Sequence, residues 1–334
     1  MKTKHKLSGL RKSMLALPLT ALLMTGCGSG SDPAGIMPLS GVVVDGYLNG
    51  ATVFIDLNGD KRLNEGEPYT LSDANGIYTL DTSSISFPLT GMTVIASGGT
   101  DTDTGLPFEG QLMQGIESEF ANQILSPFNT LASVMVEKKI TSDLSGALAL
   151  ISEKLGFSPT DIVADPVKLR DSKPQLFANQ FALQQALQLM AKANADPTAS
   201  PHQNQYRMME NFANALRNQN QNSDLGDCIL AMNLNQANIA SEFAVRLRDS
   251  VQLALRDDDP ARKRETLRTL LRTMTQLRIQ LNDCDGCQLI NESTRLEQQL
   301  QLQAGAISGL IDNDPANDAV SIEKIRTRNG QTWN

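Results

Sequence analysis

Residues 51–80 read ATVFIDLNGDKRLNEGEPYTLSDANGIYTL, a stretch in which two short apolar runs are separated by turn-forming residues. β-Branched and aromatic residues fill the runs at 51–55 and 76–80, as is typical of β-strands. The Asn-Gly pairs at 58–59 and 75–76 supply the positive φ that tight turns require. The stretch therefore predicts antiparallel strands joined by short loops.

The segments on either side carry the same signals. Strands are expected at Val42–Asp45 and Met92–Ala96, and LPFEGQL at 106–112 is a candidate for a last strand. Roughly five to seven short strands with this spacing are typical of a small antiparallel β-sandwich.

Beyond about residue 120 the apolar spacing changes to the helical period. The first helix is expected at Leu125–Lys138, with Ser126 as its cap and Pro127 in its first turn. Further amphipathic helices are expected at Leu176–Ala195, Tyr206–Arg217, Ile239–Arg256, Pro260–Leu281 and Leu289–Gln303. Because each presents one apolar face, we expect them to pack as an antiparallel bundle.

Another helix is expected at Thr141–Leu155, where apolar residues recur at helical spacing. Thr141 or Ser142 is expected to cap its beginning, and Gly156 to end it.

These changes in composition divide the chain into five segments. They are a signal peptide at 1–26, a flexible tether at 27–38, the β-sandwich at 39–118, a helical connector at 119–170 and an α-helical domain at 171–334. The expected fold class is α+β and multidomain, with a small antiparallel sandwich followed by an all-α domain.

The N-terminal segment carries the features of an export signal. Basic residues precede Met14–Thr25, which is apolar but too short to span a bilayer. The adjoining MTGC, Met24–Cys27, resembles the lipobox of bacterial lipoproteins. The resemblance implies cleavage before Cys27 and lipidation of that cysteine, palmitate included. The alternative is an ordinary secretory signal in which the cysteine is incidental.

The same resemblance implies a location. Gly28 and Ser29 follow Cys27, where lipoproteins held in the inner membrane usually carry aspartate. A lipid anchor in the outer membrane of a Gram-negative cell envelope is therefore expected.

The chain is acidic, with a formal net charge of −8 that cleavage of the basic leader would make more negative. Such an exported protein is poorly suited to nucleic acid and better suited to cations or basic partners. The expected partners are the membrane, through the lipid anchor, and an unidentified protein or surface.

The segment DLNGDKRLNEGE at 56–67 carries oxygen ligands at the spacing of a calcium loop. With Asp56 as position 1, the predicted Ca²⁺ ligands are Asp56, Asn58, Asp60, the backbone carbonyl of Arg62, Asn64 and Glu67. Lys61 replaces the glycine of an EF-hand at position 6, and a strand-like run precedes the loop. The pattern predicts a weak calcium site on a β-scaffold. The alternative is an ion-free loop held by Asx turns.

Residues 41–80 also resemble the B-type repeats of serine-aspartate adhesins and the related carboxypeptidase-regulatory-like, transthyretin-like sandwiches. The shared features are the GATV strand, the D-x-N-x-D loop ending in GE, and the SDANGIY hairpin. This resemblance implies a sandwich whose loop acids hold calcium, with Asp73 as a possible extra ligand. The segments GGTDTDTGLPFEGQL and ILSPFNTLASVMVEK that follow are similar to a helical segment of Gram-negative multidomain surface lipoproteins.

Three further cysteines remain, and export favours one disulfide. A bond from Cys228 to Cys284 or Cys287 is favoured over a local Cys284–Cys287 bridge or a reactive CDGC motif.

Sequence motifs for catalysis are absent, including G-x-S-x-G, H-E-x-x-H and the phosphate-binding glycine loops. His202, in SPHQNQ, is expected to be a surface histidine in a loop. We therefore expect a non-catalytic binding or adhesion protein. The alternatives are an accessory subunit of an envelope assembly that works through its helical domain, and an uncharacterised hydrolase.

Overall fold

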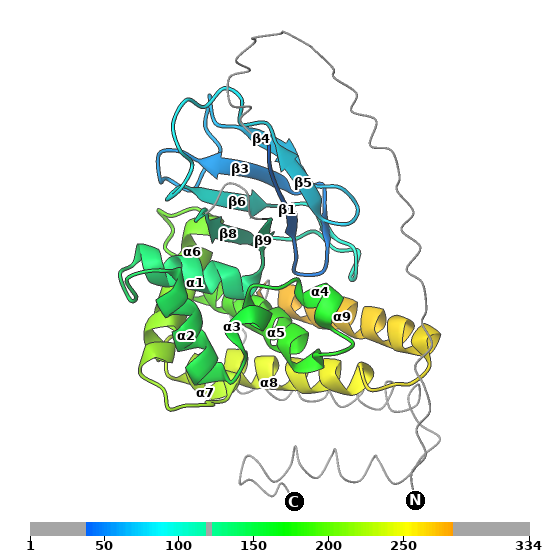
Figure 1. Cartoon of the computed structure of the whole chain (residues 1–334). Helices are drawn as coiled ribbons and strands as arrows, with labels where there is room; N and C mark the ends of the chain where they lie inside the picture. The colour runs from blue at the N-terminus through cyan, green and yellow to red at the C-terminus, as the bar shows by residue number, and fades with distance from the viewer. Residues whose placement is uncertain (1–37, 118–121, 283–334) are drawn as a thin grey trace, which may run out of the picture. The chain divides into compact units, whose positions relative to one another are not determined.

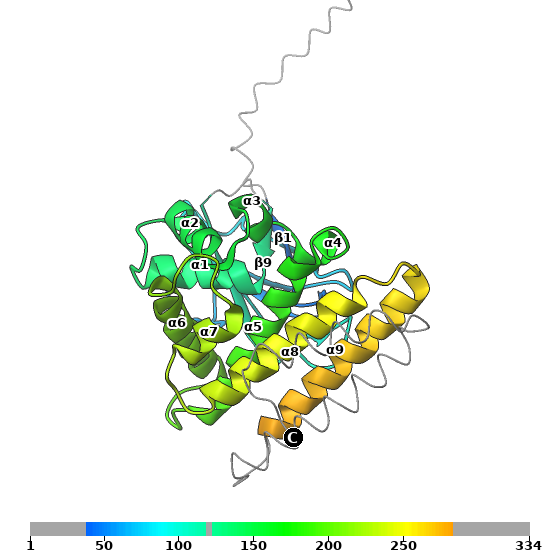
Figure 2. The same cartoon turned by 90° about the horizontal axis from the view of Figure 1, so that it is seen from below.

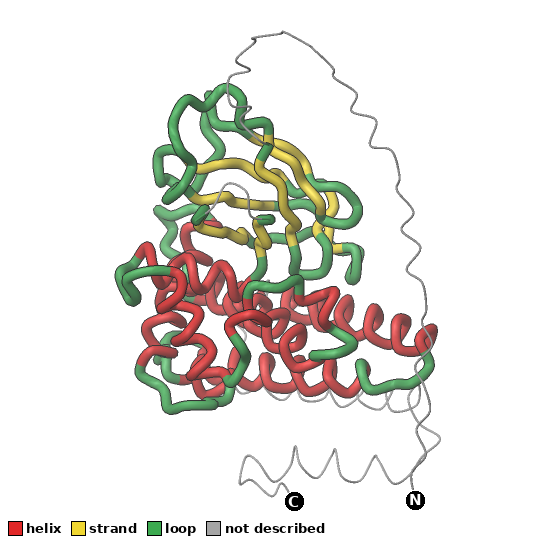
Figure 3. Tube along the Cα trace, viewed as in Figure 1, coloured by secondary structure: helices red, strands yellow, loops and turns green. Residues whose placement is uncertain are grey.

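Strands fill the first part of the described chain and helices the second (Figures 1 and 3). The computed structural model describes residues 38–117 and 122–282. All of them belong to one compact unit, Ile36–Asn334. The α+β fold class is confirmed.

The strands of this part of the chain form three sheets. Their bounds are β1 (Leu39–Val43), β2 (Leu48–Asn49), β3 (Thr52–Asp56), β4 (Tyr69–Leu71), β5 (Ile77–Leu80), β6 (Thr93–Ser97), β7 (Thr100–Asp101), β8 (Gln111–Gly115) and β9 (Gln123–Leu125). The strand orders are β4-β3-β6-β8, β5-β1-β9 and β2-β7. The four-stranded sheet is antiparallel throughout.

Strand β9 departs from the expected pattern in two ways. It pairs with β1 in parallel, with Val42 opposite Ile124, so the sheets are not purely antiparallel. It also places a strand in the segment 119–170, which was expected to be helical. Pro127 accounts for the extended backbone of Ser126, because proline disfavours the helical conformation in the residue before it.

Side chains alternate along the four-stranded sheet and reach two different apolar cores. Val53 and Val94 join a core shared with β1, β5 and β9. Phe54 and Ile95 join a second core built with the helices. Two sheets sharing one core is the packing that a sandwich requires, and the sandwich geometry itself stays a prediction.

The helices follow the strands in an unbroken series. Their bounds are α1 (Pro127–Glu137), α2 (Leu144–Leu155), α3 (Pro159–Ile162), α4 (Pro166–Leu169), α5 (Pro174–Ala193), α6 (Pro201–Arg217), α7 (Leu225–Leu230), α8 (Ala237–Ala254) and α9 (Pro260–Asn282). The long helices α5, α8 and α9 pack side by side (Figure 2). The helix expected at Leu289–Gln303 lies outside the described residues. None of the described helices is long and apolar enough to cross a membrane.

The helix ends show where local signals succeed. Ser126 caps α1 through a bond from the Asn129 amide, and Gly156 ends α2 with a φ of 77°, both as predicted. The cap of α2 is Asp143 rather than Thr141 or Ser142. Its carboxylate accepts from the Gly146 amide at 2.8 Å, and a charged acceptor there also interacts favourably with the helix dipole.

Helix α6 begins earlier than the apolar pattern indicated. Ser200 and Gln203 form a capping box, and Pro201 occupies the first turn. His202 therefore lies in a helix, not in a loop, which corrects the sequence-based expectation.

The helices hold the edge strand β8 through its backbone. The amides of Gln111, Met113 and Gly115 point away from β6, and each donates to a helix side chain. The acceptors are Gln205 Oε1 on α6 at 2.8 Å and, on α1, Thr130 Oγ1 at 2.9 Å and Ser133 Oγ at 3.0 Å. This edge is therefore closed by helix side chains rather than by another strand.

Thr130→Val tests this closure. The valine has the same shape but leaves the buried Met113 amide without its acceptor, which costs about 1–3 kcal/mol. We expect a loss of that size in the free energy of unfolding, measured by denaturant titration. Thr79→Val, the same change at an exposed position of β5, should alter it by less than about 0.5 kcal/mol. Equal effects at the two positions would contradict the closure.

Candidate functional site

The predicted calcium loop leaves the end of β3 and returns to β4. Asp56 is the last residue of β3, and Glu67 lies two residues before β4. Asp56 and Glu67 are buried, with relative solvent exposures of 4% and 8%, whereas Asn58 and Asp60 are exposed. The two ends of the loop are thus fixed in the protein and its middle faces solvent.

Backbone amides inside the loop satisfy the two buried carboxylates. Asp56 accepts from the Gly59 amide at 2.7 Å and from the Lys61 amide at 3.1 Å. Glu67 accepts from the Leu57 and Asn64 amides, each at 2.9 Å. These bonds curl the chain between positions 1 and 12 of the loop.

Three oxygens of expected ligands converge on one nitrogen. The side-chain amide of Asn64 donates to both carboxylate oxygens of Asp60, at 3.0 and 2.9 Å, and to the backbone carbonyl of Arg62 at 3.1 Å. The bond from Asn64 is the main cause that lowers the pKa of Asp60, followed by the Arg62 amide. The side-chain oxygen of Asn58 accepts from the Asp60 backbone amide and takes no part in this cluster. The Asn64 nitrogen therefore lies where a cation would meet three oxygens of two predicted ligands, Asp60 and Arg62.

Lys61 adopts the backbone conformation of the glycine that an EF-hand loop carries at position 6. Its φ is 62°, in the left-handed region that the glycine at position 6 of an EF-hand loop serves. The sharp turn of a calcium loop is therefore present, although a lysine makes it.

Asp73 is not brought to this loop. It lies in the turn between β4 and β5, where its carboxylate accepts from the amides of Asn75 and Ile77 at 2.8 and 2.9 Å. Within the described residues, the structure gathers no group of three or more histidine, cysteine, aspartate or glutamate side chains that could hold a metal.

The remaining donor set still suits a hard cation. Asp56, Asp60 and Glu67 supply carboxylate oxygens, and Arg62 supplies a carbonyl, which are the ligand types that Ca²⁺ prefers. The curled backbone and the position-6 turn fit as well. Joining all of these oxygens on one ion requires the Asn64 side chain to turn its nitrogen away.

The loop also contacts the helical region. The Lys61 ammonium bonds to Glu137 at the end of α1 at 2.6 Å, and it lies 4.6 Å from the ring centre of Tyr206 on α6. Lys138 lies 4.9 Å from the same ring. Gln111 on β8 donates to the Lys61 carbonyl at 3.0 Å. The sequence could not indicate these contacts, because about 75 to 145 residues separate Lys61 from Glu137 and Tyr206.

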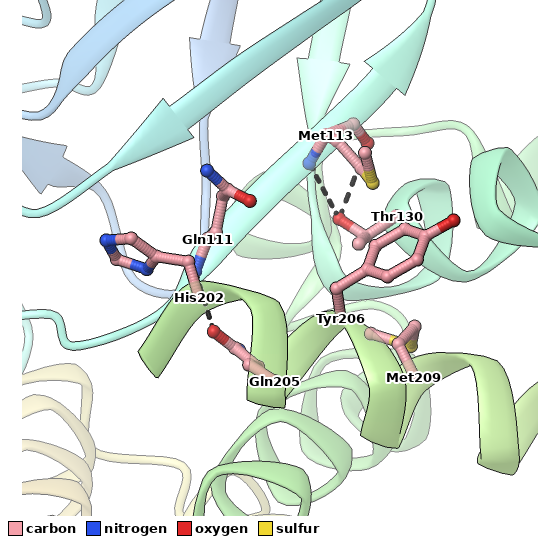
Figure 4. Close-up of a pocket in the computed structure, with 7 residues that line it drawn as sticks. All are labelled: Gln111, Met113, Thr130, His202, Gln205, Tyr206 and Met209. Atoms are coloured by element: carbon pink, nitrogen blue, oxygen red, sulfur yellow. Dashed lines mark hydrogen bonds between the residues drawn. The ribbon is translucent and has the colours of Figure 1, made fainter. Parts of the chain in front are cut away.

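A small cavity lies beside this contact, between β8, α1 and α6 (Figure 4). It is lined by Gln111, Met113, Thr130, His202, Gln205, Tyr206 and Met209, and its volume is about 10 Å³. That volume admits about one water molecule and no substrate. Burial lowers the pKa of His202, which favours the neutral ring.

Cys228 on α7 is buried and forms no disulfide with another described residue, and burial raises the pKa of its thiol to about 12. Cys27, Cys284 and Cys287 lie outside the described residues, so the lipid anchor and the disulfide stay predictions.

The chain matches no protein-family model, and neither curated proteins nor solved structures show significant similarity to it.

Lys61→Ala tests whether the loop is fastened to the helices. The alanine keeps the strained positive φ and removes the ammonium contacts, so we expect the free energy of unfolding to fall by about 1 kcal/mol. Lys61→Gly should be more stable than Lys61→Ala by about 1 kcal/mol, because glycine relieves the strain. Denaturant titration measures both differences.

Lys139→Ala is the matched control. Lys139 also has a positive φ, of 56°, but its side chain is exposed. This variant should leave the free energy of unfolding within about 0.5 kcal/mol of the wild type. A loss equal to that of Lys61→Ala would remove the case for a fastened loop.

Proposed function

We propose that the chain is a non-catalytic, lipid-anchored protein of the cell envelope that binds calcium through its 56–67 loop and acts in binding or adhesion. The observation that carries the proposal is the arrangement of the loop oxygens. Both carboxylate oxygens of Asp60 and the Arg62 carbonyl converge on one point, beside a backbone curled by Asp56 and Glu67.

Four acidic residues elsewhere in the described chain have structural roles, which supports the non-catalytic proposal. Asp143, Asp165 and Asp224 accept from the first amides of α2, α4 and α7. Asp257 forms an ion pair with Arg262 at 2.5 Å, which lowers its pKa to about 2. These carboxylates stabilise helices and turns. A general acid or base would instead need to face a substrate.

Calcium would supply a double positive charge to which Asp56, Asp60 and Glu67 are complementary. A ligand that binds only the folded loop stabilises the fold by RT ln(1 + [L]/Kd), which is about 1.4 kcal/mol at ten times Kd. Lys61 would link this stabilisation of the loop to the helices, since its ammonium contacts Glu137 on α1 and Tyr206 on α6. Ordering of the loop is thereby coupled to its contact with α1 and α6.

Calorimetric titration with calcium tests the loop. We expect saturable binding with a Kd of roughly 10⁻⁴–10⁻³ M, and a melting temperature that is higher in calcium than in chelator. Asp60→Ala should abolish the heat of binding, because it removes both oxygens nearest to the Asn64 nitrogen.

Glu65→Gln is the control for charge. It removes one negative charge from an exposed residue of the same loop, at position 10, where calcium loops carry no ligand. Binding should persist in this variant. The absence of any heat in the wild type at millimolar calcium, with identical melts, would leave the loop as an ion-free Asx turn.

The lipobox at Met24–Cys27 supports the anchor, and Cys27→Ser tests it. We expect the variant to lose incorporation of a palmitate analogue and to leave the membrane fraction of expressing bacteria, because only a thiol accepts the lipid. Cys287→Ser should remain labelled and membrane-bound. Retention of both properties by Cys27→Ser would indicate an ordinary secretory signal.

A further inference from the structure

A pair of buried aspartates lies far from the loop, where the strands meet α5 and α9. Asp45 follows β1, and Asp101 ends β7. Asp101 packs so tightly on Gly46 that a Cβ added there would lie 2.1 Å from its Oδ1. Asp101 thus lies directly against the residue that follows Asp45.

Both aspartates line a cavity of about 10 Å³, which has room for about one water molecule. Gln188 of α5 and Thr275 and Arg278 of α9 close it from the helical side. Asp45 Oδ1, Gln188 Nε2 and Thr275 Oγ1 are buried there with no hydrogen-bond partner among the described residues. Asp45 itself is 4% exposed. A buried acidic oxygen without a hydrogen-bond partner therefore belongs to a residue that lines this cavity.

The charges around the cavity do not balance. Asp103 pairs with Arg170 at 3.3 Å, and Glu109 pairs with Arg278 at 2.8 Å. Arg278 also donates to Gln185 at 3.0 Å. In the described part of the chain, no ion pair involves Asp45 or Asp101. After the pairs are formed, the cavity wall would hold two unmatched negative charges if both were ionised.

Two buried charges of the same sign cannot both persist without a cation or a proton. Burial is the main cause that raises the pKa of Asp45 well above its usual value, and the charge of Asp101 adds to it, while Arg278 opposes it. Burial, followed by the charge of Asp103, raises the pKa of Asp101 to about 6.

We propose that Asp45 and Asp101 form a proton-binding site that keeps one of the two carboxyls protonated at neutral pH and takes up a second proton as the pH falls. Proton uptake removes the repulsion next to Thr275 and Arg278, so it strengthens the contact between the strands and α9. The ligand of this site is a proton, and the site is separate from the proposed calcium loop.

The sign of the pH effect follows from the raised pKa values. Between the usual pKa of an aspartate, about 4, and the folded values, the folded protein binds more protons than the unfolded chain. The contribution of the pair to stability is therefore fully present below about pH 4, the usual pKa of an aspartate, and is lost as the pH rises through about 6, where Asp101 ionises. Acidic residues whose pKa is lowered in the folded protein, such as Asp143 and Asp257, act in the opposite direction.

Thermal unfolding of the full chain between about pH 5 and pH 8 tests the proposal. Asp45→Asn replaces the carboxyl with an amide that does not ionise. The melting temperature of this variant should therefore fall less steeply with rising pH than that of the wild type. At pH 8 the variant should melt several degrees higher than the wild type. Glu65→Gln, which removes an exposed acid, should keep the wild-type slope.

An Asp45→Asn slope equal to that of the wild type would overturn the proposal. Infrared spectroscopy of the wild type at pH 7 provides a measurement that needs no variant to fold. The proposal requires the carbonyl absorption of a protonated carboxyl, which ordinary aspartates and glutamates do not show at that pH. A spectrum without this band would equally overturn it.

Discussion

The closure of β8 by side chains of α1 and α6 is the interaction on which the rest of the structure depends. Three alternate amides of this edge strand donate to Gln205, Thr130 and Ser133 instead of to another strand. Because these bonds are directional, they fix the position of both helices along the sheet, which apolar packing alone would not do. Phe54 and Ile95 can then bury the outer face of the sheet against the helices. Strands and helices thus belong to one compact unit.

The interface between the strands and the helices, here called the seam, nevertheless contains buried polar side chains. Gln180, Gln184 and Gln188 recur at helical spacing on one face of α5 and are buried. Gln180 accepts from the Phe128 amide at 3.1 Å, and Gly110 lies so close to Gln184 that a Cβ would be 2.5 Å from its amide nitrogen. Interfaces between domains of one chain are typically more polar than a core. The seam combines this composition with tight packing, and the buried aspartates lie at its edge.

The 56–67 loop and the aspartate pair show two ways of handling buried acids. Asp56 and Glu67 are satisfied by hydrogen bonds, because backbone amides donate to every one of their carboxylate oxygens. Oδ1 of Asp45 has no hydrogen-bond donor among the described residues, and burial raises the pKa of this carboxyl, which favours the protonated form. The first arrangement fits the binding of a metal ion, and the second fits the binding of a proton.

Local sequence determined β3, β5 and β6, the Asn-Gly turns, the beginning of α1, the end of α2 and the internal bonds of the loop. The reason is that these features join residues only a few positions apart, as when Asp56 meets Gly59 and Lys61. Asp143 caps α2 in place of Thr141 or Ser142, the neighbouring polar residues that were expected to do so. Only the tertiary structure decided the parallel pairing of β1 with β9, the contact of Lys61 with Tyr206 and the approach of Asp101 to Asp45. Each joins segments far apart in the chain, and no periodicity or turn signal records which distant residues will meet once the cores are packed.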